Sequence, residues 1–259
     1  MSATNPPQPV PLKEVVKTPG YSTNVVNLID RIHRAPDIPG VLEMLRASTT
    51  TMGAEASMYA TAIPEDDTSR TVIALLACDP VWGYAQQRAC PIDEHPWFMY
   101  AREHYTPIVA SHLAPETPRQ HEAIAIAKQY GFSSALIVPT PAGGGLGRFG
   151  ILCLGSSRQG EFEGENTHLF RVFARTLAME LHEWFVKRTR DWLLRATRLR
   201  PRDLQLLGME RRGLGTKEIA NRMGLSAYAV DSRFQRIKTR LACPNRKDAA
   251  HRAAEYGLI

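Results

Sequence analysis

The spacing of apolar residues divides the chain into segments with helical and strand-like patterns. Apolar residues three or four positions apart predict helices, and such segments lie within residues 22–35, 41–49, 117–131 and 165–196. Short apolar or alternating runs bounded by polar turns predict strands, and these lie within residues 57–63, 71–78, 106–111, 134–141 and 148–156. Predicted helices therefore precede, interrupt and follow a group of predicted strands.

This order of elements predicts an α+β fold. It is typical of an α/β/α sandwich around a mostly antiparallel five-stranded sheet, which we expect over residues 21–190. Residues 1–20 are rich in proline and polar groups, so we expect a flexible tail there. The cationic stretch Thr197–Asp203 contains a proline and precedes a new helical pattern. We therefore expect a linker at residues 191–200 and a separate domain at residues 201–259.

The last domain has the pattern of four short helices. Thr216 is expected to cap the segment KEIANRMG and Gly224 to end it, while Ser226 or a nearby residue is expected to cap the next segment, YAVDSRFQRIKTRL. The apolar residues of that next segment share helical spacing, at Val230, Phe234, Ile237 and Leu241. Two helices joined by a short turn that contains glycine predict a helix-turn-helix.

Charge is distributed unevenly along the chain. From Asp191 to Ile259 there are 15 Lys and Arg residues against 7 Asp and Glu, a net charge of +8, although the whole chain carries +6. A basic module attached to a near-neutral domain indicates binding to nucleic acid. A solvated cationic helix face would give the same count. The charge therefore indicates nucleic-acid binding only together with the helical pattern.

The second helix of the predicted helix-turn-helix has a polar face opposite its apolar stripe. The major groove of DNA admits one α-helix, whose polar side chains read base edges while its cations bind phosphates. We therefore expect double-stranded DNA to be contacted by Thr216, Ser226, Asp231, Ser232, Arg233, Gln235, Arg236 and Lys238. A small helical bundle with a charged exterior is the alternative, and the capped helices together with the local charge favour DNA.

Motifs of other protein classes are missing or lie in the wrong context. The run GLGRFG at Gly145–Gly150 has the letters of a dinucleotide-binding loop, but it leads into a predicted strand, so PAGGGLG is predicted to be a hairpin turn. No GxSxG, HExxH or P-loop motif occurs, and the four cysteines lie far apart. We expect no enzyme activity, no metal site and no cofactor. No apolar run of about 18 residues predicts a membrane span, so we expect a cytoplasmic protein without a membrane partner.

The segment from Leu199 to Ala250 resembles the C-terminal DNA-binding domain of LuxR-family transcription regulators. Asp203, Leu207 and Gly213 match the family's acidic residue, leucine and glycine, and KEIANRMGLS matches its KEIA-x-x-L-G-x-S segment. The sequence departs from the family at Ala227–Ala229 and at Arg233. The resemblance implies an operator-binding regulator that acts as a homodimer, with RNA polymerase as a further suggested partner.

The larger domain resembles the acyl-homoserine-lactone-binding domain of quorum-sensing LuxR proteins. The similarity rests on DPVWGYAQQRACPIDEHPWFMYAREH and on AKQYGFSSALIVPTP, which has Gly131 at the family's glycine. The resemblance implies control by a small signal, an acyl-homoserine lactone or a divergent analogue. The alternative is a ligand-independent regulator whose N-terminal domain dimerises or binds a partner protein.

The family's pocket motif fits this chain in two registers. The family has a tryptophan, a tyrosine four residues later and Asp-Pro nine residues further on. Without gaps from Trp82, Gln86 takes the tyrosine position and His95-Pro96 takes Asp-Pro; with compensating shifts, Tyr84 and Asp93 match instead. The family's second tryptophan has no counterpart in YTPIVASHLAP. The resemblance thus implies a ligand site drawn from Trp82, Tyr84, Asp93 and His95, for which ordinary aromatic core is the alternative.

Overall fold

The computed structural model describes residues 10–65, 69–141, 146–164 and 167–259. The chain divides into two compact units, which are described separately. The first contains Met1–Ala62, Val72–Ala142 and Phe149–Glu183, and the second contains Ile63–Thr71, Gly143–Arg148 and Trp184–Ile259.

A five-stranded sheet forms the centre of the first unit. Its strands are β1 (Ala56–Pro64), β2 (Arg70–Ala77), β3 (Ile108–Val109), β4 (Ser134–Pro141) and β5 (Phe149–Ser156), in the order β2-β1-β5-β4-β3. The pairs β1–β5, β5–β4 and β4–β3 are antiparallel. The predicted mostly antiparallel sheet is confirmed, although the predicted strand over residues 106–111 is reduced to Ile108–Val109 and the short 3-10 helix η2 (Ala110–His112).

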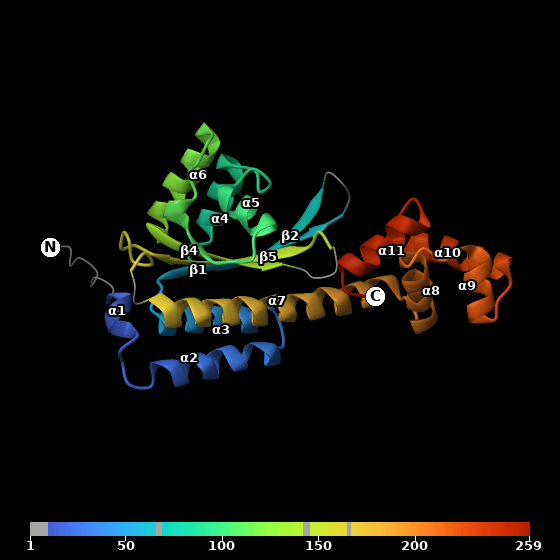
Figure 1. The fold of residues 1–259 in the computed structure, drawn as a ribbon, viewed down its shortest axis with the longest axis horizontal. Coiled ribbons are helices and arrows are strands. Elements are labelled where there is room, and N and C mark those ends of the chain that lie inside the picture. The colour runs from blue at the N-terminus through green and yellow to red at the C-terminus, as the bar shows by residue number, and fades with distance from the viewer. Residues whose placement is uncertain (1–9, 66–68, 142–145, 165–166) are drawn as a thin grey trace. The chain divides into compact units, whose positions relative to one another are not determined.

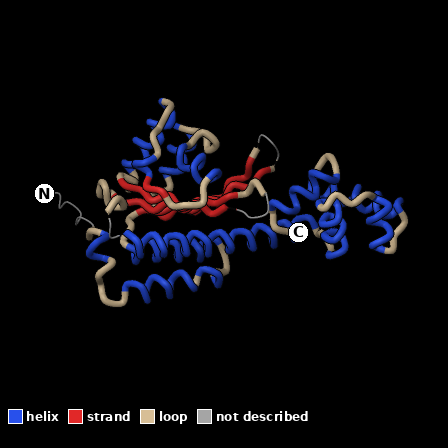
Figure 2. The backbone as a smooth tube through the Cα atoms, in the orientation of Figure 1, coloured by secondary structure: helices blue, strands red, loops and turns tan. Residues whose placement is uncertain are grey.

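Helices cover both faces of this sheet (Figure 1). On one face lie α2 (Tyr21–Asp30), α3 (Ile38–Met52) and the first part of α7 (His168–Thr197), and on the other lie α4 (Val81–Ala89), α5 (Pro96–Glu103) and α6 (Pro118–Gln129). A 3-10 turn, η1 (Ile32–Arg34), follows α2. Figure 2 shows the strands as a single layer between helices. The predicted α/β/α sandwich is therefore confirmed, and its inner strands are buried on both faces, as the fully buried β5 shows.

The sequence pattern did not predict helices α4 and α5. Both are short, nine and eight residues, and follow or begin with proline, at Pro80 and Pro96. Helix α4 also contains Gly83, where an added Cβ would lie 2.8 Å from Leu76 Cδ1 of β2. A glycine inside a helix is unfavourable by propensity alone, and here α4 lies so close to β2 that a larger residue would have to displace the end of the Leu76 side chain.

The last glycine of GLGRFG has a packing role in the first unit. Around Gly150 the Tyr59 hydroxyl lies 3.0 Å from His182 Nδ1, and the Thr140 hydroxyl lies 3.3 Å from the same nitrogen. A Cβ on Gly150 would come within 2.2 Å of Thr140 Oγ1. Because Gly150 lies in β5 and no helix begins there, the strand interpretation of this motif is confirmed; most of the PAGGGLG turn lies outside the described residues.

The N-terminal segment is more structured than expected. Where the sequence predicted a flexible tail over residues 1–20, residues Leu12–Val15 form the short helix α1, and Leu12 is buried. Leu12 Cδ1 and Val15 lie within 3.2 Å of the position that a Cβ on Gly53, after α3, would take. Two apolar side chains thus anchor this segment at the end of α3, a tertiary contact that composition does not reveal.

The second unit contains the four predicted C-terminal helices. They are α8 (Pro201–Arg211), α9 (Thr216–Met223), α10 (Ala227–Leu241) and α11 (Arg246–Glu255). Helix α10 packs against α8, α9 and α11. Residues 191–197, predicted to be a linker, belong to α7, which continues to Thr197, so residues 198–200 alone separate α7 from α8. Apolar residues spaced along 191–197, including the buried Leu193, allow the helix to continue.

Candidate functional site

The first candidate site is a group of aromatic side chains that α4 and α5 bury against the sheet. Trp82 of α4 and Trp97 of α5 are 2% and 1% exposed and belong to the same core cluster as Phe132. The Trp82 ring stacks on Phe132 with 4.5 Å between ring centroids, and the Trp97 ring lies 5.9 Å from Phe132. Helices α4 and α5 therefore hold two indoles around one phenyl ring.

Three polar side-chain atoms of α4 and α5 are buried without partners in the described part of the chain. They are Nε1 of Trp82, Nε1 of Trp97 and Oε1 of Gln86. Gln86 lies one turn after Trp82 on α4, and its Nε2 donates to the Ala123 carbonyl at 2.8 Å. Buried polar groups are normally hydrogen-bonded, so each exception calls for an explanation such as a bound molecule.

His95 lies beside these groups at the N-terminus of α5. Its Nδ1 accepts a hydrogen bond from the Trp97 backbone N–H at 3.2 Å, and its ring lies 5.3 Å from the Trp97 ring. Burial lowers the pKa of His95 to about 4, because an imidazolium without water or a counterion is unfavourable. The imidazole is therefore neutral near pH 7.

The residues implied for the pocket do not lie together. Trp82 and His95 are buried, whereas Tyr84 is 74% exposed on α4 and Asp93 is an exposed residue that lies 4.0 Å from Arg102. Gln86, which the gap-free register aligned with the family's tyrosine, is partly buried on α4, where its amide bonds the Ala123 carbonyl of α6. Trp97 was missed as a polar group of the site. The signal that could have found it is its position directly after His95-Pro96.

The second candidate site is the outer face of α10. Val230, Phe234, Ile237 and Leu241 are buried, as the sequence spacing predicts. The opposite face leaves Asp231, Ser232, Gln235 and Arg236 exposed, with Arg233 and Lys238 half-buried at its edges. The buried stripe fixes the helix to its domain, so the polar face is presented on a rigid support.

The cations of this face differ in whether their side chains contact other residues of the chain. Arg240 lies 3.6 Å from Asp203 and donates to the Arg198 carbonyl at 3.1 Å, and Lys238 Nζ is 3.5 Å from the Pro244 carbonyl. Arg233 and Arg236 have no ion pair within the described residues. These two guanidinium groups are therefore available to an anionic partner, whereas the Arg240 guanidinium already binds acceptors within its own domain.

Sequence reasoning missed one exposed aromatic residue of this helix. Tyr228, in the first turn of α10, is 84% exposed. A residue at the N-terminal end of a recognition helix is well placed to meet a base edge or a phosphate. The signal was in the sequence, because Tyr228 falls outside the apolar stripe that begins at Val230.

The two predicted helix caps have different outcomes. Ser226 is the N-cap of α10, and its hydroxyl accepts the Ala229 N–H at 3.1 Å, as predicted. Thr216 was predicted to cap α9, but Gly215 holds the cap position and Thr216 is the first helical residue. The Thr216 hydroxyl instead accepts from Arg246 of α11 at 2.8 Å. Thr216 thus joins the helix-turn-helix to the last helix.

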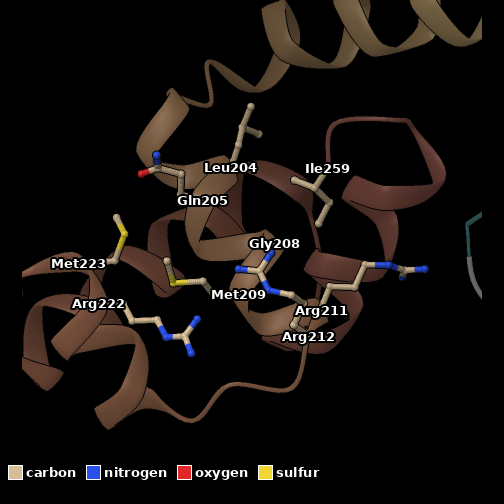
Figure 3. A pocket seen from close by; sticks show the side chains of 9 residues that line it. All are labelled: Leu204, Gln205, Gly208, Met209, Arg211, Arg212, Arg222, Met223 and Ile259. Carbon is tan, nitrogen blue, oxygen red and sulfur yellow. The ribbon is translucent and has the colours of Figure 1, made fainter. Parts of the chain in front are cut away.

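A groove of about 830 Å³ lies on another part of this domain (Figure 3). It is lined by residues of α8 and α9, by Arg212 and by the C-terminal Ile259. Methionine side chains of α8 and α9, Met209 and Met223, lie beside the guanidinium groups of Arg212 and Arg222. The groove is cationic and apolar, and it is separate from the outer face of α10.

The described residues contain neither a metal-ligand cluster nor a membrane-spanning helix. No group of three or more His, Cys, Asp or Glu side chains there could hold a metal ion. None of the helices described is long and apolar enough to cross a membrane.

Comparisons with known proteins agree with both parts of this architecture. Residues 37–184 match the family model of the autoinducer binding domain, and residues 197–253 match that of bacterial regulatory proteins of the luxR family. No curated protein matches the chain in sequence.

Solved structures share the fold at low sequence identity. Escherichia coli SdiA is 14% identical, with a TM-score of 0.70 over 91% of this chain and 97% of SdiA. SdiA in complex with octanoyl-rac-glycerol is also 14% identical, with a TM-score of 0.68 over 93% and 97% of the two chains. CepR2 from Burkholderia cenocepacia, an N-acylhomoserine lactone dependent LuxR family transcription factor, is 14% identical, with a TM-score of 0.51 over 64% and 96%. On the two family models and the fold, the chain belongs to the LuxR family of transcription regulators, with an autoinducer-binding domain and a LuxR-type helix-turn-helix.

Proposed function

We propose that this chain is a homodimeric, sequence-specific DNA-binding transcription regulator of the cytoplasm, controlled by a small acyl signal bound in its sensor unit. The observation that carries the proposal is the outer face of α10, where polar side chains and guanidinium groups without an ion pair to any described residue stand opposite a fully buried stripe. A contact with RNA polymerase is part of the same proposal. The groove with Arg212, Arg222, Met209 and Met223 offers a cationic and apolar surface for it.

The side chains of α10 divide into two roles. Arg233, Arg236 and Lys238 are cations suited to phosphates, which position the protein without reading sequence. Gln235 and Asp231 are uncharged or anionic at the exposed centre of the face, and their side chains are suited to base edges. Phosphate contacts release counterions, so we expect binding to weaken steeply as salt increases.

The test is binding of the full-length protein to an operator selected from random duplexes, compared with random DNA. Arg236→Ala is expected to weaken binding to both and to lower the salt dependence by about one phosphate. Gln235→Ala is expected to change base preference by about 1–3 kcal/mol, with little effect on random DNA. Arg211→Ala, an exposed cation of α8 outside the α10 face, is the matched control and should change neither. Equal losses on both DNAs for Arg236→Ala and Gln235→Ala would contradict the division of roles.

The signal part of the proposal is supported by the family and by the two indole nitrogens beside Phe132, which are buried without a partner among the described residues. One structurally similar protein is in complex with an acylglycerol and another is dependent on acyl-homoserine lactones. Mass spectrometry of an organic extract of protein purified from its native host tests this part. Repeated absence of a co-purifying small molecule, with no compound that stabilises the protein, would favour the ligand-independent alternative.

A further inference from the structure

Helix α10 carries a line of side chains that lies directly opposite its buried stripe. The buried residues are Val230, Phe234, Ile237 and Leu241. A residue two positions before a buried one lies about 200° away around the helix, on the side farthest from the core. Counting back two positions from each buried residue gives Tyr228, Ser232, Gln235 and Thr239, which are all exposed. These four residues are the outer line of α10.

Tyr228 is the first residue of the outer line and its one aromatic member. It lies in the first turn of α10, whose start is fixed by the Ser226 cap. Tyr228 is 84% exposed, and its hydroxyl has no hydrogen bond to a described residue. Its neighbours in the chain, Ala227 and Ala229, are too small to cover an aromatic ring. The ring as well as the hydroxyl is therefore accessible to a partner.

The position of Tyr228, more than its exposure, indicates a role. Single exposed apolar residues are common on protein surfaces. However, the recognition helix of a helix-turn-helix contacts base edges with its N-terminal residues. Tyr228 also shares the outer line with Gln235, the side chain proposed above to read bases. If α10 enters the major groove by this face, the Tyr228 side chain enters it too.

A tyrosine side chain has two chemically different ways to contact DNA. Its hydroxyl can bond a phosphate oxygen, a contact that carries no sequence information. Its ring is apolar, and the apolar group that a base pair presents in the major groove is the C5-methyl group of thymine. The cations Arg233 and Arg236 of the same helix are already suited to phosphates. A contact through the ring uses the property that distinguishes Tyr228 from the rest of the outer line.

We propose that Tyr228 reads the C5-methyl group of a thymine in each operator half-site, and that it does so through its ring. The inference rests on the proposed sequence-specific binding of DNA by α10. It deepens that proposal, because it adds a specificity-determining residue and names the base that this residue selects.

Deoxyuridine tests the proposal on the DNA side, because it lacks the methyl group of thymine and keeps the same hydrogen-bonding edge. The probe is a duplex selected from random sequences with the full-length protein, in which each thymine position is replaced in turn in both half-sites. At one position we expect the wild type to lose about fourfold in affinity per half-site, which is the share of one buried methyl group. A selected operator in which deoxyuridine is tolerated at every thymine, or which contains no thymine, would overturn the proposal.

Two variants test the same contact on the protein side. Tyr228→Ala removes the ring, so it is expected to lose the response to deoxyuridine at that position and to keep any response at other thymines. Tyr228→Phe removes the hydroxyl alone and is expected to keep the response. Because residue 228 is exposed, both variants are expected to fold. A response that persists in Tyr228→Ala would assign the methyl contact to another residue, and a response lost in Tyr228→Phe as well would assign the contact to the hydroxyl; either result contradicts the proposal.

Tyr105→Ala is the matched control, because it removes a tyrosine of the first unit that is 71% exposed. It is expected to respond to deoxyuridine as the wild type does. A wild-type protein that prefers no duplex over random DNA would count against the proposed regulator, and the role of Tyr228 would fall with it. A wild-type protein that binds a selected operator but ignores the methyl groups would leave the regulator standing and show that the role of Tyr228 is wrong.

Discussion

At the scale of single residues, burial rather than residue type decides what the side chains of the sensor unit can do. Tyr84 and Trp82 are two positions apart on α4, yet one is 74% and the other 2% exposed. Two positions correspond to more than half a helical turn, so the side chains face opposite ways. Burial also keeps the His95 imidazole neutral, so this side chain is an uncharged hydrogen-bonding group.

His95 makes the stability of the protein depend on pH. Its pKa is about 4 in the folded protein, against about 6.5 in an unfolded chain. Between these values the unfolded state binds more protons, so the free energy of unfolding falls as the pH drops from about 6.5 to about 4 and then levels off. Over this pH range the free energy of unfolding falls by about 3 kcal/mol in total.

The measurement is the difference in unfolding free energy between the wild type and His95→Asn, taken by denaturant titration across this pH range. The difference should shrink as the pH falls, because only the wild type bears the cost of keeping the imidazole neutral. His112→Asn, which removes an exposed histidine, is the control and should give a constant difference. A constant difference for His95→Asn as well would contradict the assignment.

Gly150 is predicted to be intolerant of a side chain. An alanine Cβ would lie 2.2 Å from Thr140 Oγ1 and 2.6 Å from the Tyr59 hydroxyl. Gly150→Ala should therefore lower the free energy of unfolding by about 1–3 kcal/mol, the usual range for overpacking a buried site. Gly164→Ala has no atom within 4 Å of the new Cβ and is the matched control. Equal stability of the two variants in urea titration would contradict the prediction, because it would mean that the Thr140 and Tyr59 side chains shift to accommodate the new Cβ.

At the scale of elements, the helix-turn-helix depends on local capping as well as on its apolar stripes. Ser226 caps α10, and the Asp203 carboxylate accepts the Arg200 N–H at the start of α8. Each interaction satisfies a backbone donor that the helix itself leaves free. The match of Asp203 to the family's acidic position thus has a physical reason.

Ser226→Ala and Thr216→Ala should separate a capping hydroxyl from one inside the helix. Loss of the Ser226 cap is expected to destabilise α10 by about 1 kcal/mol, and Ser226→Asp should retain the stability. Thr216→Ala removes an acceptor for Arg246 but no cap, so we expect a smaller effect at the start of α9. Hydrogen exchange at the first turn of each helix, in the full-length protein, measures both. Faster exchange in α9 of Thr216→Ala than in α10 of Ser226→Ala would contradict this order.

At the scale of the whole molecule, the long helix α7 leaves an apolar stripe uncovered in the monomer. Phe173, Leu177, Leu181 and Phe185, which the sequence placed on an apolar helix, are buried within the chain. Leu169, Val172 and Met179 are about half exposed, and their spacing puts them on one face of the helix. We predict that this stripe contacts the same helix of a second copy.

Sedimentation at micromolar concentration tests the dimer. Val172→Glu is expected to weaken self-association at least tenfold, because a carboxylate would be buried in an apolar contact. It should also weaken binding to an operator with two half-sites about one DNA turn apart. Val81→Glu changes a similarly exposed valine on α4 and is the control. A wild-type protein that is monomeric with and without operator DNA would refute the prediction.

The alternation and spacing of apolar residues were sufficient to predict the sheet, the sandwich and the four C-terminal helices. Each of these elements buries one face or both, and burial imposes a period of two or 3.6 on the sequence. Charge and turn chemistry then led to the prediction that α10 binds DNA. The turn itself is set by local geometry, since Gly224 and Ser226 separate α9 from α10.

Only the tertiary structure decided the features that depend on contacts between distant segments. The helices α4 and α5 are too short and too weakly patterned to be predicted, and they are held by packing on the sheet and on α6. The anchoring of Leu12, the continuation of α7 to Thr197 and the role of Gly150 arise in the same way. Which of Tyr84, Gln86, Asp93 and His95 faces the interior was open in the sequence, because compensating two-residue shifts keep the family's nine-residue spacing between its two polar groups. In the structure, the buried Trp82 fixes the rotation of α4 and the His95 cap fixes the start of α5. These two features determine which side chains point inward, and sequence spacing alone does not reveal that direction.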